Sequence, residues 1–377
     1  MEKPYRLMTP GPVQVPESVL KELGRPMIHH RTPEFEKILT RVLGRLKEVF
    51  QTKQPVFIQA ATGSGGLESA IVNTLSPGDK VVAIVSGKFG ERWRDIAKNY
   101  GMNVISLEVE WGKALDPRML DATLELHMDV RAVLTQACET STAVVHPMKE
   151  IGRIVRAKSN AILMVDGITA LGVMDLPMDA WNLDVVVGGS QKSFMLPAGL
   201  QFIALSEKAW DFQTRAKCPR YYWDLKEELK ANKANQTRFS TPVPYVRALD
   251  AGLEVMLKDG LQSNITRFAR LAKQLRAGGE KLGLKVYAEA PSPSVTAFVT
   301  PVDGEKLRDH LEAKYNITVM GGQDKLKGKI IRIGTLGYIS EEDLEATLES
   351  LANALTDLGH SADGKSAVAA FRMVVRK

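Results

Sequence analysis

The stretch DVVVGGSQKSF, residues 184–194, decides the fold class of this 377-residue chain. Residues 184–187 are rich in valine and do not alternate with polar residues, which is typical of an interior strand of a parallel sheet. Two glycines end the run, and Ser190, Gln191 and Lys192 follow. We therefore expect Lys192 to lie at the end of a buried strand.

From residue 55 onward, short apolar runs of this kind alternate with amphipathic segments. The runs are 55–60, 80–86, 103–109, 131–137, 161–166, 184–189 and 200–206. Helical spacing follows several of them, at 67–75, 89–101 and 146–158, with turn signals such as SPGD between. Repeated strand–helix units predict an α/β domain with a mostly parallel, seven-stranded sheet covered by helices.

The character of the chain changes after residue 210. Residues 211–245 are polar and irregular, long helices are expected at 245–257 and 264–282, and shorter strand and helix patterns follow. We predict a smaller C-terminal α+β domain. The expected divisions are an extended N-terminal arm (1–20), a large domain (21–257), a small domain (258–360) and a C-terminal extension (361–377). The sequence leaves open whether that extension docks as a helix, docks as a strand or stays mobile.

Composition limits the classes of function. The formal charge of +6 comes from 50 basic and 44 acidic residues spread along the chain, so we expect no nucleic-acid partner, while small anions remain plausible ligands. Only Cys138 and Cys218 are present, without metal-ligand spacing, which argues against a disulfide framework or a metal site. With no apolar run long enough for a signal peptide or a membrane span, we expect a soluble cytoplasmic protein.

Three features together indicate the chemistry. A lone lysine after a strand is usually a solvated surface charge. Here the run 161–166 also delivers Asp166 to a strand end, where open α/β sheets bind ligands. The segment TGSGG, residues 62–66, is a glycine-rich turn that opens a helix, and such a turn can hold a phosphate. An imine-forming amine, a carboxylate for a pyridinium nitrogen and a phosphate cradle are the groups that pyridoxal phosphate needs.

A longer series of motifs resembles one family. TPGP, ATGSGGLE, SGKFGERW, ETSTAVVHP, VDGITALG, GGSQK, MGG and IRIGTLG occur in this order. They resemble the class V aminotransferases of fold type I, specifically the alanine/serine–glyoxylate branch. The resemblance runs from about residue 6 to 358, so only the C-terminal tail lies outside it.

The resemblance implies a role for individual residues. Lys192 would form the Schiff base with pyridoxal phosphate and act as the base, and Asp166 would pair with the pyridinium nitrogen. Phosphate contacts are implied for Thr62, Gly63, Ser64 and Gln191, ring stacking for Phe89, and a hydrogen bond near the phenolic oxygen for Thr140. Many relatives have tryptophan at the position of Phe89, and a core phenylalanine is the alternative interpretation.

Substrate and partner roles follow in the same way. Arg332 would bind the α-carboxylate of the substrate through its two-pronged guanidinium. Gly11 and His30 would line the substrate site, with His29 and Arg31 beside His30. Ser240 and Thr241 would reach the phosphate from a partner subunit, which implies a homodimer with shared active sites.

The implied function is transfer of an amino group from alanine, serine or a similar amino acid to glyoxylate or pyruvate, with ping-pong kinetics. Cysteine desulfurisation is the nearest alternative, but it needs a thiol on a mobile loop. A non-catalytic subunit, for example of a hydrogenase, is another, although two cysteines cannot hold an iron–sulfur or nickel centre. A dinucleotide-dependent oxidoreductase is disfavoured because ATGSGG lacks the GxGxxG spacing.

Overall fold

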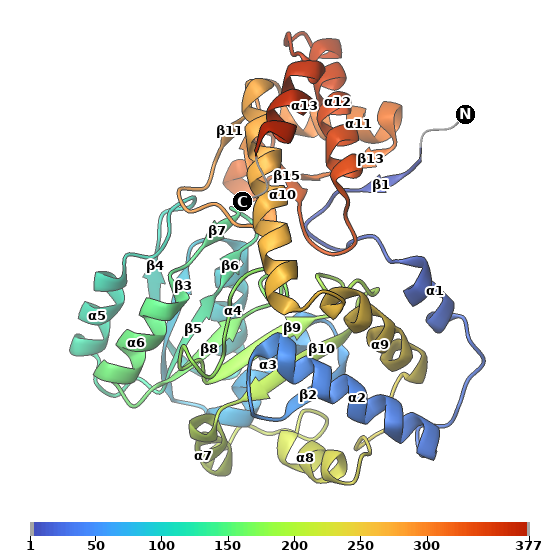
Figure 1. The fold of residues 1–377 in the computed structure, drawn as a ribbon. Helices are drawn as coiled ribbons and strands as arrows, with labels where there is room; N and C mark the ends of the chain where they lie inside the picture. The colour runs from blue at the N-terminus through green and yellow to red at the C-terminus, as the bar shows by residue number, and fades with distance from the viewer. Residues whose placement is uncertain (1–3, 375–377) are drawn as a thin grey trace.

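The computed structural model describes residues 4–374. A large α/β unit carries a smaller unit at one end, and the long helix α10 (Leu261–Lys281) runs from the first into the second (Figure 1). Among the described residues, no helix combines the length and the apolar character needed to cross a membrane.

The large unit is built on a seven-stranded sheet with the order β2-β10-β9-β8-β5-β3-β4. Strands β4, β3, β5, β8 and β9 are parallel, and β10 runs antiparallel to both β9 and β2. The bounds are β2 Val56–Ala61, β3 Lys80–Val85, β4 Asn103–Glu108, β5 Ala132–Gln136, β8 Ile162–Asp166, β9 Val185–Gly189 and β10 Gly199–Leu205. Each of the seven apolar runs predicted from the sequence forms one of these strands, so the predicted sheet is confirmed.

Helices cover both faces of this sheet, because alternate strand residues point to opposite sides. One face packs Val82, Leu163 and Val186 against α2, α5, α6 and α9, and the other packs Ala83, Met164 and Val187 against α3, α4 and α7. The helices of the large unit are α1 Glu17–Leu23, α2 Pro33–Phe50, α3 Gly63–Thr74, α4 Lys88–Asn99, α5 Pro117–Leu126, α6 Met148–Lys158, α7 Glu207–Arg215, α8 Leu225–Lys233 and α9 Val243–Leu257.

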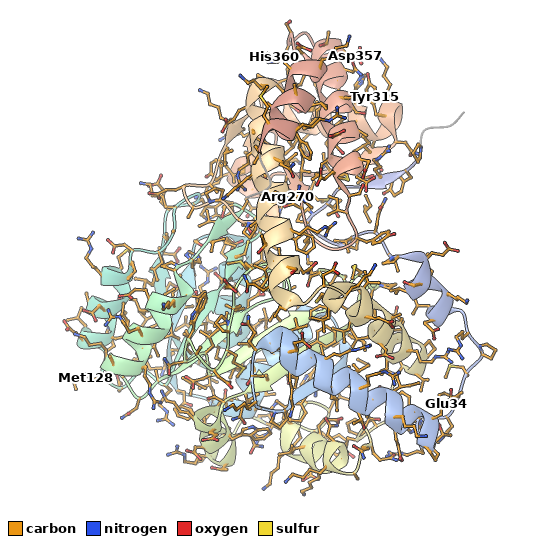
Figure 2. The ribbon with its side chains drawn as sticks, viewed as in Figure 1. Glu34, Met128, Arg270, Tyr315, Asp357 and His360 are labelled. Carbon is orange, nitrogen blue, oxygen red and sulfur yellow. The ribbon has the colours of Figure 1, made fainter. Side chains whose placement is uncertain are left out.

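The smaller unit has a four-stranded antiparallel sheet with the order β11-β12-β15-β14. Its elements are β11 Lys285–Val286, β12 Val295–Val299, α11 Gly304–Tyr315, β13 Ile317–Thr318, β14 Met320–Gly321, η1 Asp324–Leu326, β15 Ile330–Gly334, α12 Glu341–Asp357 and α13 Gly364–Met373. At its outer end Tyr315 and Asp357 lie side by side (Figure 2), and the Tyr315 hydroxyl donates to Asp357 Oδ2 at 3.0 Å. This bond ties α11 to α12.

Two local features differ from the sequence expectations or extend them. The N-terminal segment is not wholly extended, because residues 17–23 form α1, which buries Val19. In the C-terminal extension, residues 364–373 form α13, which buries Ala367, Val368 and Phe371 and packs on α10 and α12. Residues 375–377 of that extension lie outside the described residues.

The N-terminal arm joins the two units. Strand β1 (Arg6–Leu7) pairs in parallel with β13, and Gly334 at the end of β15 donates its N–H to Met8 O at 2.8 Å. A Cβ on Gly334 would lie 2.2 Å from Thr9 O, so the arm can approach β15 this closely only because residue 334 is glycine.

Two short strands, β6 (Cys138–Glu139) and β7 (Val144–Val145), form a separate hairpin beside the large sheet.

Replacing Gly334 with alanine should therefore destabilise the protein. The added methyl group meets the backbone of the arm, which must shift, and we expect the free energy of unfolding to fall by about 1–3 kcal/mol. The matched control is Gly44→Ala in α2, where a Cβ meets nothing within 4 Å. That change should raise stability by about 0.5–1 kcal/mol, because glycine is costly inside a helix. Chemical denaturation measures both, and equal stabilities of the two variants would contradict the proposed close contact.

Candidate active site

Lys192 and Asp166 lie at the same edge of the large sheet. Asp166 ends β8, and Lys192 follows β9, its parallel neighbour, in which Val187 pairs with Asp166. The turn after β9 is fixed from within: Ser190 Oγ donates to Pro197 O at 2.7 Å, and Ser193 Oγ donates to Leu171 O at 2.5 Å. Both functional side chains are therefore held at the carboxyl ends of the strands, where the sequence predicts a ligand site.

The amine of Lys192 is buried. The residue is 9% exposed, and Nζ donates to Pro10 O, on the N-terminal arm, at 2.7 Å. A Cβ on Gly11 would lie 2.3 Å from Nζ, so a side chain at position 11 would occupy the space of the amine. Burial lowers the pKa of Lys192 to about 8, although the Asp166 carboxylate opposes the shift. About a tenth of the amine is thus neutral at pH 7, far more than for a lysine in water.

The carboxyl of Asp166 is buried as well. It is 6% exposed and accepts a hydrogen bond from Ile168 N at 2.9 Å. Burial raises its pKa to about 7, and the nearby Glu139 charge adds to the rise. About half of the Asp166 carboxyl is therefore protonated at pH 7, and a cationic group that enters the cleft would favour the carboxylate.

The turn at residues 62–64 forms an anion cradle next to these side chains. Thr62 precedes α3 without a side-chain cap, and no protein acceptor in the described part of the chain reaches the N–H groups of residues 63–65. A Cβ on Gly63 would lie 2.3 Å from Ile168 Cδ1, so the turn packs directly on the loop after Asp166. Free amides at a helix start, together with the helix dipole, favour a phosphate.

Gln191 and Arg92 complete this cradle. Gln191 Oε1 is buried without a hydrogen-bond partner among the described residues, and it lies beside Gly189, as does the N–H of Gly63. Arg92 on α4 donates to Ser64 Oγ at 3.3 Å and lies over the half-buried ring of Phe89, 4.9 Å from its centroid. An unsatisfied buried amide next to an anion cradle indicates a polar ligand, and a glutamine that turns its NH2 group into the cradle can donate to a phosphate.

Arg332 reaches the same cleft from the smaller unit. It is 4% exposed on β15, where Nε donates to Gly321 O and Nη1 donates to Thr140 O, each at 3.0 Å. Burial lowers the pKa of Arg332 to about 10, so the guanidinium remains charged at neutral pH. Thr140 is buried too, and its Oγ1 is 2.9 Å from Thr169 Oγ1. Within the described residues Nη2 of Arg332 has no acceptor, which leaves it free for a substrate carboxylate.

Three predicted site residues lie elsewhere in the same chain. Ser240 is exposed and Thr241 half-buried in the segment before α9, and His30 lies in the loop between α1 and α2. The two segments are neighbours, because Arg31 Nη1 donates to Gln236 Oε1 at 2.6 Å. Among the described residues, no hydrogen bond or ion pair joins them to Lys192, Asp166 or Arg332.

Sequence reasoning missed three contributors to the site. Pro10 supplies the carbonyl that binds the Lys192 amine, Arg92 contacts Ser64, and Glu139 is fully buried behind Phe89. A signal for Glu139 existed, because it closely follows the apolar strand β5, as Asp166 ends β8. Pro10 could not be found in this way, since its contribution comes from the backbone.

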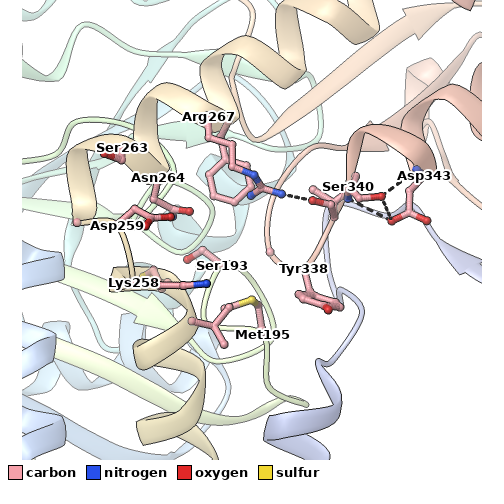
Figure 3. Close-up of a pocket in the computed structure, with 16 residues that line it drawn as sticks. Ser193, Met195, Lys258, Asp259, Ser263, Asn264, Arg267, Tyr338, Ser340 and Asp343 are labelled. Carbon is pink, nitrogen blue, oxygen red and sulfur yellow. Dashed lines mark hydrogen bonds between the residues drawn. The ribbon is translucent and has the colours of Figure 1, made fainter. Parts of the chain in front are cut away.

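A separate cavity of about 430 Å³ lies at the junction of the two units, beside the turn that follows Lys192. Lys258, Asp259 and Ser263 line one side, and Tyr338 and Asp343 line the other (Figure 3). Ser193 is part of its wall, but the residues predicted to hold the cofactor are not. The cavity is therefore an interdomain cleft beside the candidate active site.

The comparisons with known proteins place the chain in a family. Residues 11–346 match the family model described as aminotransferase class-V. The chain is 39% identical to the "Soluble hydrogenase 42 kDa subunit" of Anabaena cylindrica, with 96% of this chain and 95% of that protein covered. It is 35% identical to the L-aspartate–glyoxylate aminotransferase of Paracoccus denitrificans (strain Pd 1222), covering 97% and 94%. The structure of ureidoglycine–glyoxylate aminotransferase from Bacillus subtilis superposes with a TM-score of 0.91 at 30% identity, covering 99% of each chain. The chain belongs to the class V aminotransferase family.

Membership of this family implies pyridoxal phosphate as the cofactor, and the cleft contains the groups that the cofactor needs. The cradle at residues 62–64 suits its phosphate, the carboxyl of Asp166 suits a protonated ring nitrogen, and the buried amine of Lys192 suits its aldehyde. The partner-free Gln191 Oε1 is a further sign that the cleft is built around a polar ligand.

The raised pKa of Asp166 predicts how stability depends on pH in the cofactor-free protein. The folded state keeps a proton that the unfolded state releases above its usual pKa of 3.8, so stability is lost as the pH rises toward 7. Asp166→Asn removes this loss. The free energy of unfolding of Asp166→Asn, relative to that of the wild type, should therefore increase between pH 4 and 8, by at most about 4 kcal/mol.

Urea denaturation of both proteins across this pH range measures the effect. Asp116→Asn is the control, because the pKa of the Asp116 carboxyl is lowered by Arg118, and its stability difference should stay flat between pH 5 and 8. A difference for Asp166→Asn that does not change with pH would contradict the raised pKa.

Proposed function

We propose that this protein is a pyridoxal-phosphate-dependent aminotransferase that moves an amino group from alanine, serine or aspartate to glyoxylate or pyruvate. The observation that carries the proposal is the joint burial of the Lys192 amine and the Asp166 carboxyl, between the phosphate cradle and Arg332. The glyoxylate acceptor in the names of the Paracoccus and Bacillus relatives supports the choice of oxo acid.

In this proposal the cofactor residues act by binding and orientation. The free N–H groups of residues 63–65, the hydroxyls of Thr62 and Ser64 and the NH2 group of Gln191 hold the phosphate, and Asp166 keeps the ring nitrogen protonated. Phe89 stacks on the ring, and Thr140 donates near the phenolic oxygen. The bound cofactor supplies an aldehyde that takes up the amino group and a ring that accepts the electron pair released at the α-carbon.

Lys192 and Arg332 act on the substrate. Two backbone carbonyls orient the Arg332 guanidinium, which binds the α-carboxylate with its remaining donors. The Lys192 amine then takes the proton from the α-carbon of the substrate and delivers it to the cofactor carbon that carried the aldehyde. Its pKa of about 8 suits this work, because the amine must be neutral to accept the proton and protonated to return it. Pro10 O holds the amine in the cleft.

We also propose that two copies of the chain complete each site. Within the described residues, no hydrogen bond joins Ser240 or Thr241 to residues 62–65 of their own chain, which supports a role in the phosphate site of the partner subunit. His30 lies in the neighbouring segment and would line the partner's substrate entrance. In this proposal the protein is a homodimer with active sites at its interface.

Cysteine desulfurisation has little support from the thiols. Cys138 and Cys218 are both buried, and burial raises the pKa of each thiol, which makes both poor nucleophiles. The hydrogenase name of the Anabaena relative raises the alternative of a subunit without catalytic activity. The buried amine and carboxyl argue against it, since their burial costs stability and serves no evident packing role.

Turnover with a panel of amino acids tests the proposal. The protein with pyridoxal phosphate should convert alanine, serine or aspartate to its oxo acid only when glyoxylate or pyruvate is present.

Lys192→Ala should lower kcat by about 10³-fold or more, because the base is removed. The control is Lys208→Ala, since Lys208 Nζ also donates to a backbone carbonyl, that of Ala161, but lies at the opposite edge of the sheet. It should keep kcat within about twofold. Sulfide release from cysteine without an oxo acid, or full activity of Lys192→Ala, would contradict the proposal.

A further inference from the structure

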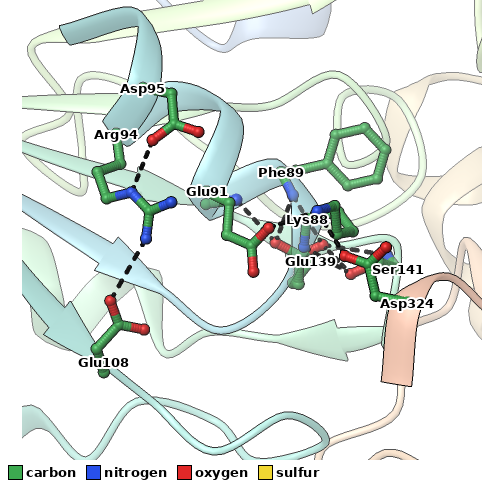
Figure 4. A network of polar contacts seen from close by, with 10 residues as sticks. Lys88, Phe89, Glu91, Arg94, Asp95, Glu108, Glu139, Ser141 and Asp324 are labelled. Atoms are coloured by element: carbon green, nitrogen blue, oxygen red, sulfur yellow. Dashed lines mark hydrogen bonds and ion pairs between the residues drawn. The ribbon is translucent and has the colours of Figure 1, made fainter. Parts of the chain in front are cut away.

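Glu139 is a buried carboxylate to which the proposed function gives no role. It is fully buried in β6, and its two oxygens accept hydrogen bonds from two different parts of the chain (Figure 4). Oε2 accepts from the N–H groups of Phe89 and Gly90, at 3.1 and 3.0 Å. Oε1 accepts from the N–H of Ser141 at 3.1 Å and from the Ser141 hydroxyl.

These bonds replace the missing cap of α4. The helix begins after Gly87, which has no side chain to satisfy the first-turn amides. The loop at 139–141 satisfies them instead, because Lys88 N donates to Ser141 Oγ at 3.0 Å while Phe89 and Gly90 donate to Glu139. A Cβ on Gly87 would lie 2.3 Å from Ser141 Oγ, so the helix start and the loop are in close contact.

The hydrogen bonds to Glu139 favour its ionised form. Burial raises the pKa of the carboxyl, while the bonds from Ser141 and the backbone oppose the rise. Three of its partners are backbone N–H groups, which can only donate, and the fourth is the Ser141 hydroxyl. The positive end of the α4 dipole and the charge of Arg332 also favour the carboxylate.

The same carboxylate therefore fixes two walls of the cleft. On one side it holds the start of α4, which carries Phe89 and Arg92. On the other side it holds the loop that carries Thr140, whose carbonyl orients Arg332. Loss of Glu139 would leave the bond from Lys88 N to Ser141 Oγ and would weaken the connection between the two walls.

We propose that Glu139 is a positioning residue that sets Phe89 and Thr140 at the spacing that the cofactor ring requires. This inference rests on the proposed function, because it assumes that pyridoxal phosphate occupies the cleft. Glu139 does not contact the reacting atoms; it acts through the residues that it holds.

The test compares Glu139→Gln with a matched buried carboxylate. The glutamine NH2 would face the N–H groups that now donate to Glu139, so at least one bond is lost. Asp184→Asn is the control: Asp184 is also buried and accepts from Leu163 N at 2.9 Å and Ser206 Oγ at 2.7 Å, but it lies at the amino end of β9. Two quantities are measured on cofactor-free protein: hydrogen–deuterium exchange of residues 88–90 and 141, and the dissociation constant for added pyridoxal phosphate.

Glu139→Gln should raise the dissociation constant at least tenfold and speed exchange at 88–90 and 141. Asp184→Asn should lower the midpoint of thermal unfolding while its dissociation constant stays within twofold of the wild type. If Glu139→Gln fails to fold, Ser141→Ala replaces it in the test. Its dissociation constant for pyridoxal phosphate should rise at least threefold. Cofactor binding within twofold of the wild type in the folded variant would overturn the inference and leave the proposed function intact. Wild-type protein that takes up no pyridoxal phosphate would overturn the proposed function and this inference with it.

Discussion

The amine of Lys192 and the carboxyl of Asp166 are buried at the carboxyl ends of neighbouring strands, and burial moves the two pKa values toward each other, to about 8 and about 7. Without a partner, each buried charge lowers the stability of the folded protein, because the charge has lost its contact with water. A ligand that offers an aldehyde to the amine and a cationic nitrogen to the carboxylate removes both costs. The apolar strands β8 and β9 create this condition, because they carry the two side chains to the edge of the sheet with little access to water.

The other parts of the chain hold this pair in place. The N-terminal arm provides Pro10 O for the lysine, and it is anchored to β13 and to Gly334 of β15. The smaller unit provides Arg332, which binds the backbone of Gly321 and Thr140. Glu139 links the Thr140 loop to the helix that carries Phe89. The N-terminal arm, the smaller unit and the loop at Glu139 thus all contribute to the candidate active site beside β8 and β9. Movement of any one of these regions would change the geometry of the site.

Much of this arrangement could be predicted from the sequence. The seven apolar runs form the seven strands, and the residues that end or follow them, Asp166 and Lys192, lie at the predicted edge. The antiparallel direction of β10 was not foreseen, although a loop of only nine residues after β9 is too short for the crossover that a parallel strand needs. The roles of Pro10 and Glu139 escaped prediction because they depend on backbone contacts across the fold. Positions such as His30 and Ser240 could be assigned only by resemblance, and within the described residues no hydrogen bond or ion pair joins them to Lys192, Asp166 or Arg332.

Covalent trapping tests the central claim most directly. Wild-type protein is incubated with pyridoxal phosphate and reduced with borohydride, which fixes any imine to the lysine that formed it, and the peptides are then analysed by mass spectrometry. We expect one phosphopyridoxyl group per chain, on the peptide that carries Lys192, and none after prior addition of an excess of alanine. A label on another lysine, or no label on Lys192, would contradict the account.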